Sequence, residues 1–404
     1  MTFDREFYKG KRVLLTGHTG FKGTWMSMVL AEMGAEVTGY AREPAADAVL
    51  FKRSGIAGRI RSEIGDIRDL PHLLQVFEEV QPEIVIHMAA QPIVLESYRN
   101  PVDTYAVNVM GTVNVCECIR RTASVRSFVN VTTDKVYRNT EEAEAFTEED
   151  VLDGFDPYSN SKSCSELVTA SYLRSFLREK QVSVSTVRAG NVIGGGDFAA
   201  DRIIPDCVRA AIKGEAVQLR NPDAVRPFQH VLDPVYVYLM IAAGQYADPD
   251  LAGSYNAGPD PCDFYTVGRL TGCFLESWNR RAEKKPDGAL LSVPVSESCR
   301  NTAENHTGPE ETAGRTPDGA DGKNGNKAPH EAKILTLDCT KLKKTFGWSP
   351  VWNMDTAMEV TVEWYAADAA GEDIRPVMQA QIDRFEKAFI SGEKTPSSAS
   401  GEQL

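Results

Sequence analysis

A short apolar run, a glycine-rich turn and a helical pattern, in that order, constrain the fold of this chain most. Residues 11–16 (KRVLLT) predict a buried strand, the turn is Gly17-His18-Thr19-Gly20-Phe21-Lys22-Gly23, and TWMSMVLAEMG after it has the apolar spacing of a helix. This order opens a βαβ unit. The glycines let the backbone bend tightly and bring a helix N-terminus, with its free N–H groups, against a pyrophosphate. We therefore predict a dinucleotide site here, rather than a turn needed only for packing.

Further strand and helix patterns alternate along the first half of the chain. Such alternation predicts a parallel sheet covered on both faces by helices. The predicted fold class is therefore α/β, a Rossmann-type doubly wound parallel sheet with a smaller mixed α/β substrate domain. The strand-like segments are residues 35–40, 59–64, 83–87, 127–132 and 182–188, and the helical patterns are residues 71–80, 104–121, 157–179 (after the N-cap Asp156) and 354–370.

The alternation breaks after Gly190, and we place the start of a second domain near residue 189. Residues 1–188 are expected to form the dinucleotide-binding domain and residues 189–391 mainly the substrate domain. Residues 296–326 contain almost no large apolar side chain, so burial cannot offset the entropy of ordering them. We predict a mobile surface insertion there and a disordered tail at residues 392–404.

The composition excludes several classes of protein. Acidic residues outnumber basic ones 57 to 44, and the net charge of −13 disfavours a nucleic-acid partner. The longest apolar stretch, residues 235–243, is about half of the roughly 20 residues that cross a bilayer, and the N-terminus lacks a secretory signal pattern. We expect a cytoplasmic protein without a membrane partner. Its 8 cysteines have no zinc-ligand spacing, so no metal site is predicted.

Tyr158 and Lys162 are the most informative pair of polar residues. Four residues apart on a predicted helix, they share a face, so an ammonium lies near the phenol. Moving a tyrosine pKa from about 10 towards neutral requires roughly 4 kcal/mol of preference for the phenolate, which this ammonium, an oxidised nicotinamide and a helix N-terminus together supply. The phenolate is then a base for a sugar hydroxyl, although such a pair is also common on protein surfaces.

The segment Thr132-Thr133-Asp134-Lys135 adds weight to that interpretation. It follows a predicted central strand at its carboxyl end, where open parallel sheets bind ligands. Taken alone, it is equally an ordinary polar strand exit. We expect it to face the same crevice as the tyrosine and the lysine.

The residues after the second strand do not decide between NAD and NADP. A ribose-binding carboxylate is expected there, but the sequence is Gly39-Tyr40-Ala41-Arg42. Arg42 either pairs with a 2′-phosphate or is an ordinary exposed arginine. Asp66 and Ile67 either contact the adenine side of a cofactor, or Asp66 caps a helix.

With these motifs the chain resembles the extended short-chain dehydrogenase/reductase superfamily and, within it, the CDP-glucose 4,6-dehydratases. Related dTDP-glucose and GDP-mannose dehydratases carry a glutamate at the position of Lys135. This chain also differs from the family at Glu96, where family members often have a basic residue. The resemblance covers residues from about 11 to 367, except the insertion. Its narrower stretches are HMAAQP at 87–92, Thr133-Asp134-Lys135, DPYSNSKS at 156–163, VRAGNVIGGGDF at 187–198, RPFQHVLDP at 226–234, HEAKILTLD at 330–338 and GWSP at 347–350.

The resemblance implies an NAD-dependent hydro-lyase that converts CDP-glucose into CDP-4-dehydro-6-deoxyglucose and water. Tyr158 would take the proton of the glucose 4-hydroxyl while hydride leaves C4, assisted by Lys162 and Thr133. Lys135 would then take the C5 proton, and Asp134 would protonate the departing 6-hydroxyl. These two roles need a neutral lysine and a protonated aspartate, and an ion pair between the two residues would prevent both.

The same resemblance implies binding residues and an assembly. Arg202 and Arg226 would bind the substrate diphosphate, because arginine offers paired donors to phosphate oxygens. Asn191 and His230 are further substrate candidates, and each is alternatively a satisfied loop or core residue. A homodimer, or a dimer of dimers, is expected through the helices beginning near Thr104 and Asp156. The predicted NAD-binding residues are Gly17, His18, Gly20, Phe21, Lys22, Gly23, Asp66, Ile67, Ala89, Ala90, Gln91, Asn108, Thr132, Tyr158 and Lys162.

Two other functions fit part of the pattern. Another nucleotide-sugar epimerase or reductase of the same superfamily would share the Tyr158 and Lys162 pair but form no dehydrated product. A non-catalytic dinucleotide-binding scaffold would use the insertion to bind a partner.

Overall fold

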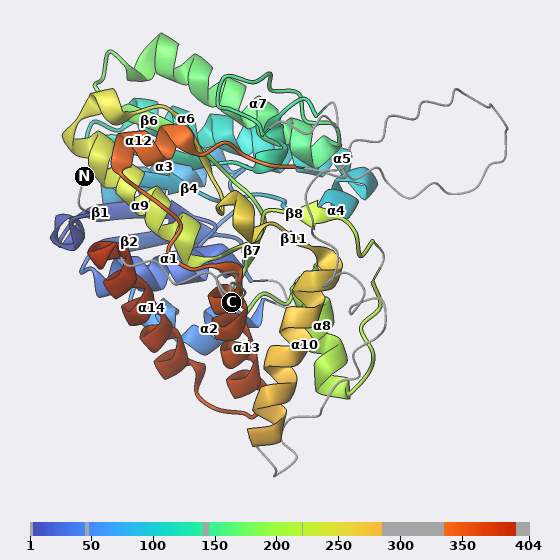
Figure 1. Ribbon diagram of the computed structural model, residues 1–404. Helices are drawn as coiled ribbons and strands as arrows, with labels where there is room; N and C mark the ends of the chain where they lie inside the picture. Colours follow the sequence, from blue (N-terminus) through green and yellow to red (C-terminus); the bar gives the residue numbers. More distant parts are fainter. Residues whose placement is uncertain (1–2, 45–47, 140–144, 220, 285–334, 393–404) are drawn as a thin grey trace, which may run out of the picture.

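The computed structural model describes residues 3–44, 48–139, 145–219, 221–284 and 335–392 (Figure 1). The predicted insertion at 296–326 and the tail beyond Gly392 lie outside these residues, so both remain predictions. Within the described ranges, no helix has the length and apolar character needed to span a membrane.

A seven-stranded parallel sheet forms the centre of the molecule. Its strand order is β10-β6-β5-β4-β1-β2-β3, and every neighbouring pair runs parallel. The first six strands in the chain follow the Rossmann order 3-2-1-4-5-6, which confirms the predicted fold class. The strands are β1 (Arg12–Thr16), β2 (Glu36–Ala41), β3 (Arg61–Ile64), β4 (Ile84–His87), β5 (Ser127–Val131), β6 (Ser183–Ala189) and β10 (Ser254–Ala257).

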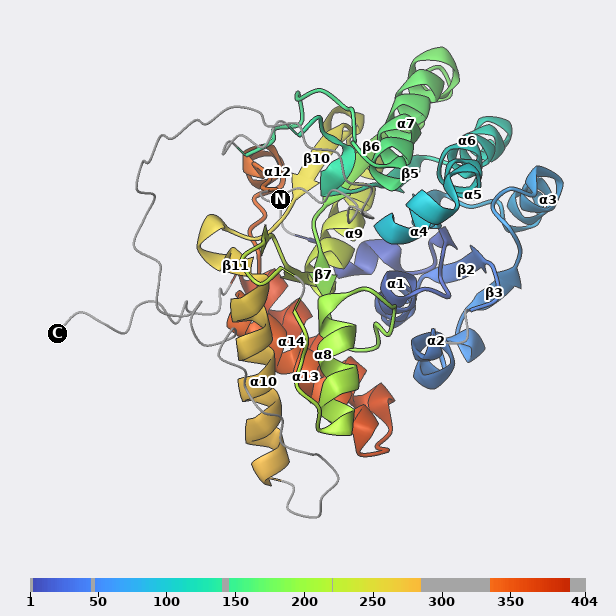
Figure 2. The same ribbon diagram turned by 90° about the vertical axis from the view of Figure 1, so that its right-hand side faces the viewer.

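Helices cover both faces of the sheet, as Figure 2 shows. One face is covered by α1 (Phe21–Glu32) and α9 (Leu232–Ala247), and the other by α3 (Leu70–Val80), α6 (Gly111–Arg121) and α7 (Pro157–Tyr172). The single helix predicted over residues 104–121 consists of α5 (Pro101–Tyr105), a π-helical turn at Ala106–Met110 and α6. A second π turn, Leu173–Leu177, extends α7.

Most of the remaining elements lie beyond residue 189. Two elements beyond residue 189 belong to the seven-stranded sheet or pack on it: β10 extends its edge, and α9 packs on β5 and β6. The division into a nucleotide and a substrate domain stays a prediction. The elements are α2 (Val49–Ser54), α4 (Val94–Arg99), α8 (Ile203–Lys213), α10 (Val267–Lys284), α12 (Thr340–Phe346), α13 (Met354–Ala369), α14 (Ile374–Ser391), the strand pairs β7 (Val192–Ile193) with β9 (Gln229–His230) and β8 (Val225–Arg226) with β11 (Tyr265–Thr266), and the 3-10 turns Arg5–Tyr8, Ile56–Gly58, Asp134–Val136, Pro249–Leu251 and Pro261–Asp263.

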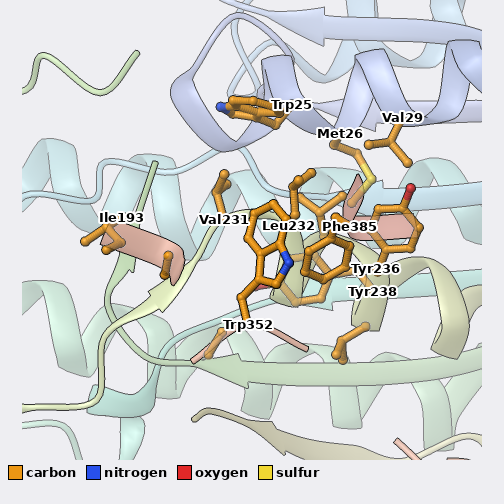
Figure 3. Close-up of a cluster of buried hydrophobic side chains, with 14 of the residues drawn as sticks. Trp25, Met26, Val29, Ile193, Val231, Leu232, Tyr236, Tyr238, Trp352 and Phe385 are labelled. Atoms are coloured by element: carbon orange, nitrogen blue, oxygen red, sulfur yellow. The ribbon is translucent and has the colours of Figure 1, made fainter. Parts of the chain in front are cut away.

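The main core lies between α1, α9 and the C-terminal helices (Figure 3). Trp25 of α1, Tyr236 of α9 and Phe385 of α14 are completely buried in it. The apolar run at residues 235–243 is thus an interior helix, because side chains on all of its faces are covered. This core fixes the N-terminal end of α1, where the glycine turn lies.

Candidate active site

The glycine turn between β1 and α1 has a conformation that requires glycine. Gly17 has φ of 81°, in the left-handed region. A Cβ atom on Gly23 would lie 2.0 Å from the carbonyl oxygen of Gly17. Gly20 caps α1 and has no side chain to occupy the N–H groups of its first turn, Phe21 onward. The turn therefore leaves a helix N-terminus open to an anion at the carboxyl end of β1.

The two polar side chains of the turn reach in different directions. His18 is fully buried, with Nε2 2.7 Å from the hydroxyl of Ser62, and burial lowers its pKa to about 4. Lys22 places Nζ 3.4 Å from the hydroxyl of Tyr238. Burial, followed by the charge of Arg202, lowers the pKa of Lys22 to about 7. His18 thus lies towards β3, and Lys22 lies near the predicted catalytic residues Lys162, Asp134 and Lys135, whose charges act on its pKa.

Asp66 and Ile67 follow β3, at the carboxyl end of the strands where the glycine turn also lies. A hydrogen bond from the Arg68 side chain to Asp66 is the main cause of its lowered pKa. The helix-capping alternative for Asp66 is wrong, because Asp69 caps α3 and accepts from the backbone N–H of His72. Ile67 is buried, 5 % exposed.

The loop after β4 is held by Asn108 from the π-helical turn. Its Oδ1 accepts from the backbone N–H of Gln91 at 2.8 Å, and its Nδ2 donates to the backbone oxygen of Gln91 at 3.1 Å and to the hydroxyl of Ser161 at 2.8 Å. Ala89 and Ala90 precede this clamp, and the N–H of Ala89 donates to Thr16 at 3.1 Å. Asn108 therefore shapes the loop through its amide, and its direct contact with the cofactor stays a prediction.

Tyr158 and Lys162 are brought to the carboxyl end of β5 by α7. Asp156 caps this helix by accepting from the backbone N–H of Ser159 at 3.0 Å, as predicted. Burial raises the pKa of Tyr158 to about 12, and a hydrogen bond with the Thr133 side chain acts in the opposite direction. Lys162 donates to the backbone oxygen of Val131 at 3.1 Å, and burial lowers its pKa to about 8. Thr133 is the second residue beyond β5, and its hydrogen bond with the phenol joins it to the two residues on α7.

Asp134 and Lys135 form an ion pair in the 3-10 turn that follows. Nζ of Lys135 lies 2.8 Å from Oδ1 of Asp134 and 3.2 Å from Oδ1 of Asn191. Asp134 is completely buried, and Thr133 also donates to its Oδ1 at 2.9 Å. Among the described residues, its Oδ2 has no hydrogen-bond partner. Such an ion pair favours a charged lysine and an ionised aspartate, whereas the predicted roles need a neutral lysine and a protonated aspartate.

Of the predicted substrate residues, Asn191 contacts this pair directly. Asn191 touches Lys135, and a Cβ atom on the preceding Gly190 would lie 3.4 Å from Oδ2 of Asp134. Arg202 donates to Asp197 at 2.9 Å, and its charge acts on the pKa of Tyr158. Arg226 belongs to β8 and donates to the backbone oxygen of Val225 at 2.9 Å.

Comparison with known proteins decides the family. Residues 13–258 match the model of the NAD dependent epimerase/dehydratase family. The chain belongs to this family.

Two curated relatives match almost their full lengths. The chain is 38% identical over 391 residues to a CDP-glucose 4,6-dehydratase from Salmonella typhimurium, covering 95% of this chain and 99% of the relative. It is 26% identical to a probable dTDP-glucose 4,6-dehydratase from Sinorhizobium fredii, covering 88% of this chain and 92% of the relative.

Solved structures of similar proteins agree with the fold. DesIV, a dTDP-glucose 4,6-dehydratase from Streptomyces venezuelae solved with NAD and TYD, aligns with a TM-score of 0.67, 23% identity and coverage of 91% and 99% of the two chains. A UDP-glucose 4-epimerase from Thermotoga maritima aligns with a TM-score of 0.65, 20% identity and coverage of 88% and 99%. At these identities the likeness concerns the architecture alone.

The ring of His230 is buried between aromatic side chains. Its ring is completely buried, with centroids 4.8 Å from the ring of Trp352 and 6.1 Å from that of Trp25. Its Nδ1 accepts from the backbone N–H of Leu232 at 3.3 Å, and burial lowers its pKa to about 3. These contacts are those of a core residue, but Nε2 of His230 has no hydrogen-bond partner among the described residues, so its role in substrate binding stays a prediction.

Thr132 contacts a buried ion pair that was not predicted from the sequence. Its hydroxyl donates to Glu166 at 2.6 Å, and Glu166 pairs with Arg188 of β6. Both charged side chains are nearly inaccessible, 3% and 4% exposed. Glu166 lies four residues beyond Lys162 on the same face of α7, and Arg188 is a cation within an apolar strand. Those two signals were available in the sequence.

Proposed function

We propose that the protein is an NAD-dependent nucleotide-sugar 4,6-dehydratase whose substrate is CDP-glucose. The observation that carries the proposal is the gathering of Thr133, Tyr158 and Lys162 with the Asp134 and Lys135 pair at the carboxyl end of β5. The first three suit oxidation of a sugar hydroxyl, and the last two suit removal of water. The relative that is 38% identical over nearly its full length is named for this activity and this nucleotide.

The turn and the strand ends fit NAD. The left-handed Gly17, the absence of room for a Cβ on Gly23 and the open N-terminus of α1 form a cradle for a pyrophosphate. Backbone groups of Ala89 to Gln91 lie beside that turn, because a Cβ on Gly17 would meet the N atom of Ala89 at 2.9 Å. When bound, NAD supplies a reversible acceptor for the hydride that leaves C4 and returns at C6.

In the first step Tyr158 takes the proton of the 4-hydroxyl. The phenol must ionise for this, and moving its pKa from about 12 to neutral requires about 7 kcal/mol of preference for the phenolate. Thr133 and Arg202 already act in that direction, through a hydrogen bond and through charge. Lys162 lies one helical turn beyond the tyrosine on α7 and is held at the end of β5 by its hydrogen bond to the backbone oxygen of Val131.

In the second step Lys135 takes the C5 proton and Asp134 gives a proton to the departing 6-hydroxyl. The ion pair and the neutral pair contain the same number of protons, so one transfer along the 2.8 Å contact interconverts them. In water that transfer costs roughly 9 kcal/mol. Burial lowers the cost because the neutral pair needs no solvation of two charges. Oδ2 of Asp134 is buried and has no hydrogen-bond partner among the described residues, so it retains the capacity to bind one more polar group.

In this proposal the two parts of the chain bind different ligands. Residues 1–188 would bind the cofactor and residues 189–391 chiefly the nucleotide sugar, with the diphosphate held by Arg202 and Arg226. Apolar side chains exposed on neighbouring helices support a homodimer: Val102 of α5 is 82% exposed and Leu167 of α7 is 55% exposed. A cytoplasmic location is part of the same proposal.

The test is incubation of the purified protein with CDP-glucose, with and without added NAD, followed by mass spectrometry of the sugar nucleotide. We expect a loss of one water from CDP-glucose and much slower loss from the dTDP, UDP and GDP sugars. Turnover that isomerises or reduces the sugar without losing water would favour another member of the family. An unchanged substrate under all conditions would reject an enzymatic role.

A further inference from the structure

The proposed dehydration leaves the two acid–base residues with mismatched protons. Tyr158 ends the cycle with one proton more, taken from the 4-hydroxyl. Asp134 ends it with one proton fewer, given to the 6-hydroxyl that leaves as water. Lys135 takes a proton from C5 and returns it to C5 when hydride arrives at C6, so its proton count does not change. Before the next turnover, one proton must therefore move from Tyr158 to Asp134.

The side chain between these two residues is Thr133. Its hydroxyl donates to Oδ1 of Asp134 at 2.9 Å and is the hydrogen-bonding neighbour of the Tyr158 phenol. A hydroxyl has one donor and two acceptor positions, so it can accept from one group while it donates to the other. Among the residues that the structure describes, Thr133 is thus the one whose hydroxyl interacts with both the carboxylate and the phenol.

Exchange with solvent is a poor alternative route for this proton. Asp134 is completely buried, Thr133 is 5% exposed and Tyr158 is 8% exposed. Water therefore has little access to the carboxylate that has to be protonated. A route within the protein is correspondingly more important here than in an open site.

The two residues are also coupled electrostatically. The negative charge of Asp134 raises the pKa of Tyr158, so an ionised carboxylate favours a protonated phenol. Protonation of Asp134 removes that effect and makes the phenol more acidic. Protonation of Asp134 therefore favours loss of the proton from Tyr158.

We propose that Thr133 is a proton relay that returns the proton of the sugar 4-hydroxyl from Tyr158 to Asp134 after each turnover. The phenol O–H bond breaks as its proton passes to Oγ1 of Thr133, and the original hydroxyl proton of Thr133 passes to Oδ1 of Asp134. No net charge or oxidant is needed, because each proton that Tyr158 gives to Thr133 is matched by one that Thr133 gives to Asp134. This inference rests on the proposed dehydration.

The test compares Thr133→Val, which removes the hydroxyl at nearly constant shape, with Thr133→Ser, which keeps it. We expect kcat for water loss to fall about 10²-fold in the valine variant and to stay within about 3-fold in the serine variant. The informative readout is the isotope effect of deuterium at C4 of CDP-glucose on kcat. If the return of the proton to Asp134 limits turnover in Thr133→Val, the isotope effect on kcat shrinks towards 1. Small buffer acids and bases then raise kcat in proportion to their concentration, because they replace the missing relay.

A hydrogen bond that only positions Tyr158 gives the opposite result. Oxidation at C4 would then be slowed itself, so the isotope effect would persist or grow, and buffer would not restore kcat; that outcome overturns the relay. Thermal unfolding of each variant checks the fold, and Thr133→Ala is judged by the same two readouts if valine is not accommodated. Failure of the dehydration proposal looks different, because wild-type protein would then release no water from CDP-glucose.

Discussion

Lys135 donates from Nζ to Oδ1 of Asp134 at 2.8 Å, and this contact is the main counter-charge of a fully buried carboxylate. Removing one partner of a buried pair leaves the other charge uncompensated, which is costly. In the proposed mechanism, Asp134 and Lys135 act in the elimination of water and Tyr158 acts in the oxidation at C4. Their removal should therefore separate oxidation from elimination.

Lys135→Met should still transfer hydride to NAD in the presence of CDP-glucose but should not release water. The thioether side chain retains the length of lysine and cannot accept the C5 proton, so the dehydration rate should fall by about 10² to 10⁴. Reduced cofactor is followed by its absorbance, and the sugar product by mass spectrometry. Lys213→Met, at an exposed position on α8, serves as the control. Dehydration at the wild-type rate by Lys135→Met would exclude the lysine as the base.

Gly23→Ala should weaken NAD binding through the geometry of the turn. The added Cβ would lie 2.0 Å from the backbone oxygen of Gly17 and cannot be accommodated unless the turn moves away from α1. The cradle then loses its shape, and we expect the dissociation constant for NAD to rise at least 10-fold in a titration followed by intrinsic fluorescence. Gly58→Ala is the matched control, because a Cβ there would meet nothing within 4 Å. Equal affinities for the two alanine variants would contradict the role of the turn.

The sheet and the turn could be predicted because local signals determine them. Apolar runs of four to seven residues produced β1, β4, β5 and β6 at nearly their observed bounds. The strand at 59–64 and the helix at 71–80 were also found within two residues. Asp156 and Pro157 marked the start of α7 because capping is a local interaction.

Contacts between distant segments could not be read from local patterns. His230 lies in a motif shared with the family, but whether its ring faces the cavity or the core depends on Trp25 and Trp352, which come from elements far apart in the chain. The pairing of Glu166 with Arg188 likewise depends on how α7 packs on β6. The sequence allowed an ion pair between Asp134 and Lys135 but did not predict it, because the directions of side chains in a short turn do not follow from local patterns.

His230 should also contribute to the pH dependence of stability. Its folded-state pKa of about 3 lies below the ordinary 6.5, so between these values the unfolded chain binds a proton that the folded protein does not. The free energy of unfolding therefore falls as pH drops below about 6.5, by up to about 1.4 kcal/mol per pH unit from this residue. Asp233, whose pKa burial raises to about 7, acts with the opposite sign.

Urea unfolding between pH 5 and pH 7 measures both effects. His230→Gln should make the free energy of unfolding fall less steeply towards acid, by about 1.4 kcal/mol per pH unit. Asp233→Asn should make the fall steeper, because it removes a group that takes up a proton in the folded state. If both variants had the pH slope of the wild type, neither buried group would titrate as the structure indicates.

Leu167→Glu should weaken self-association. Leu167 is 55% exposed on α7, and Val102 of α5 and Met110 of the adjoining π turn are 82% and 52% exposed on elements that pack against that helix. Apolar side chains grouped on neighbouring helices are typical of a surface that another chain covers. Because a glutamate carboxylate there would be buried without a partner in a dimer, we expect the dimer to dissociate in sedimentation equilibrium. Ile212→Glu, at a 48% exposed position on α8, should leave the mass unchanged. Equal masses for wild type and Leu167→Glu would show that α7 does not form the interface.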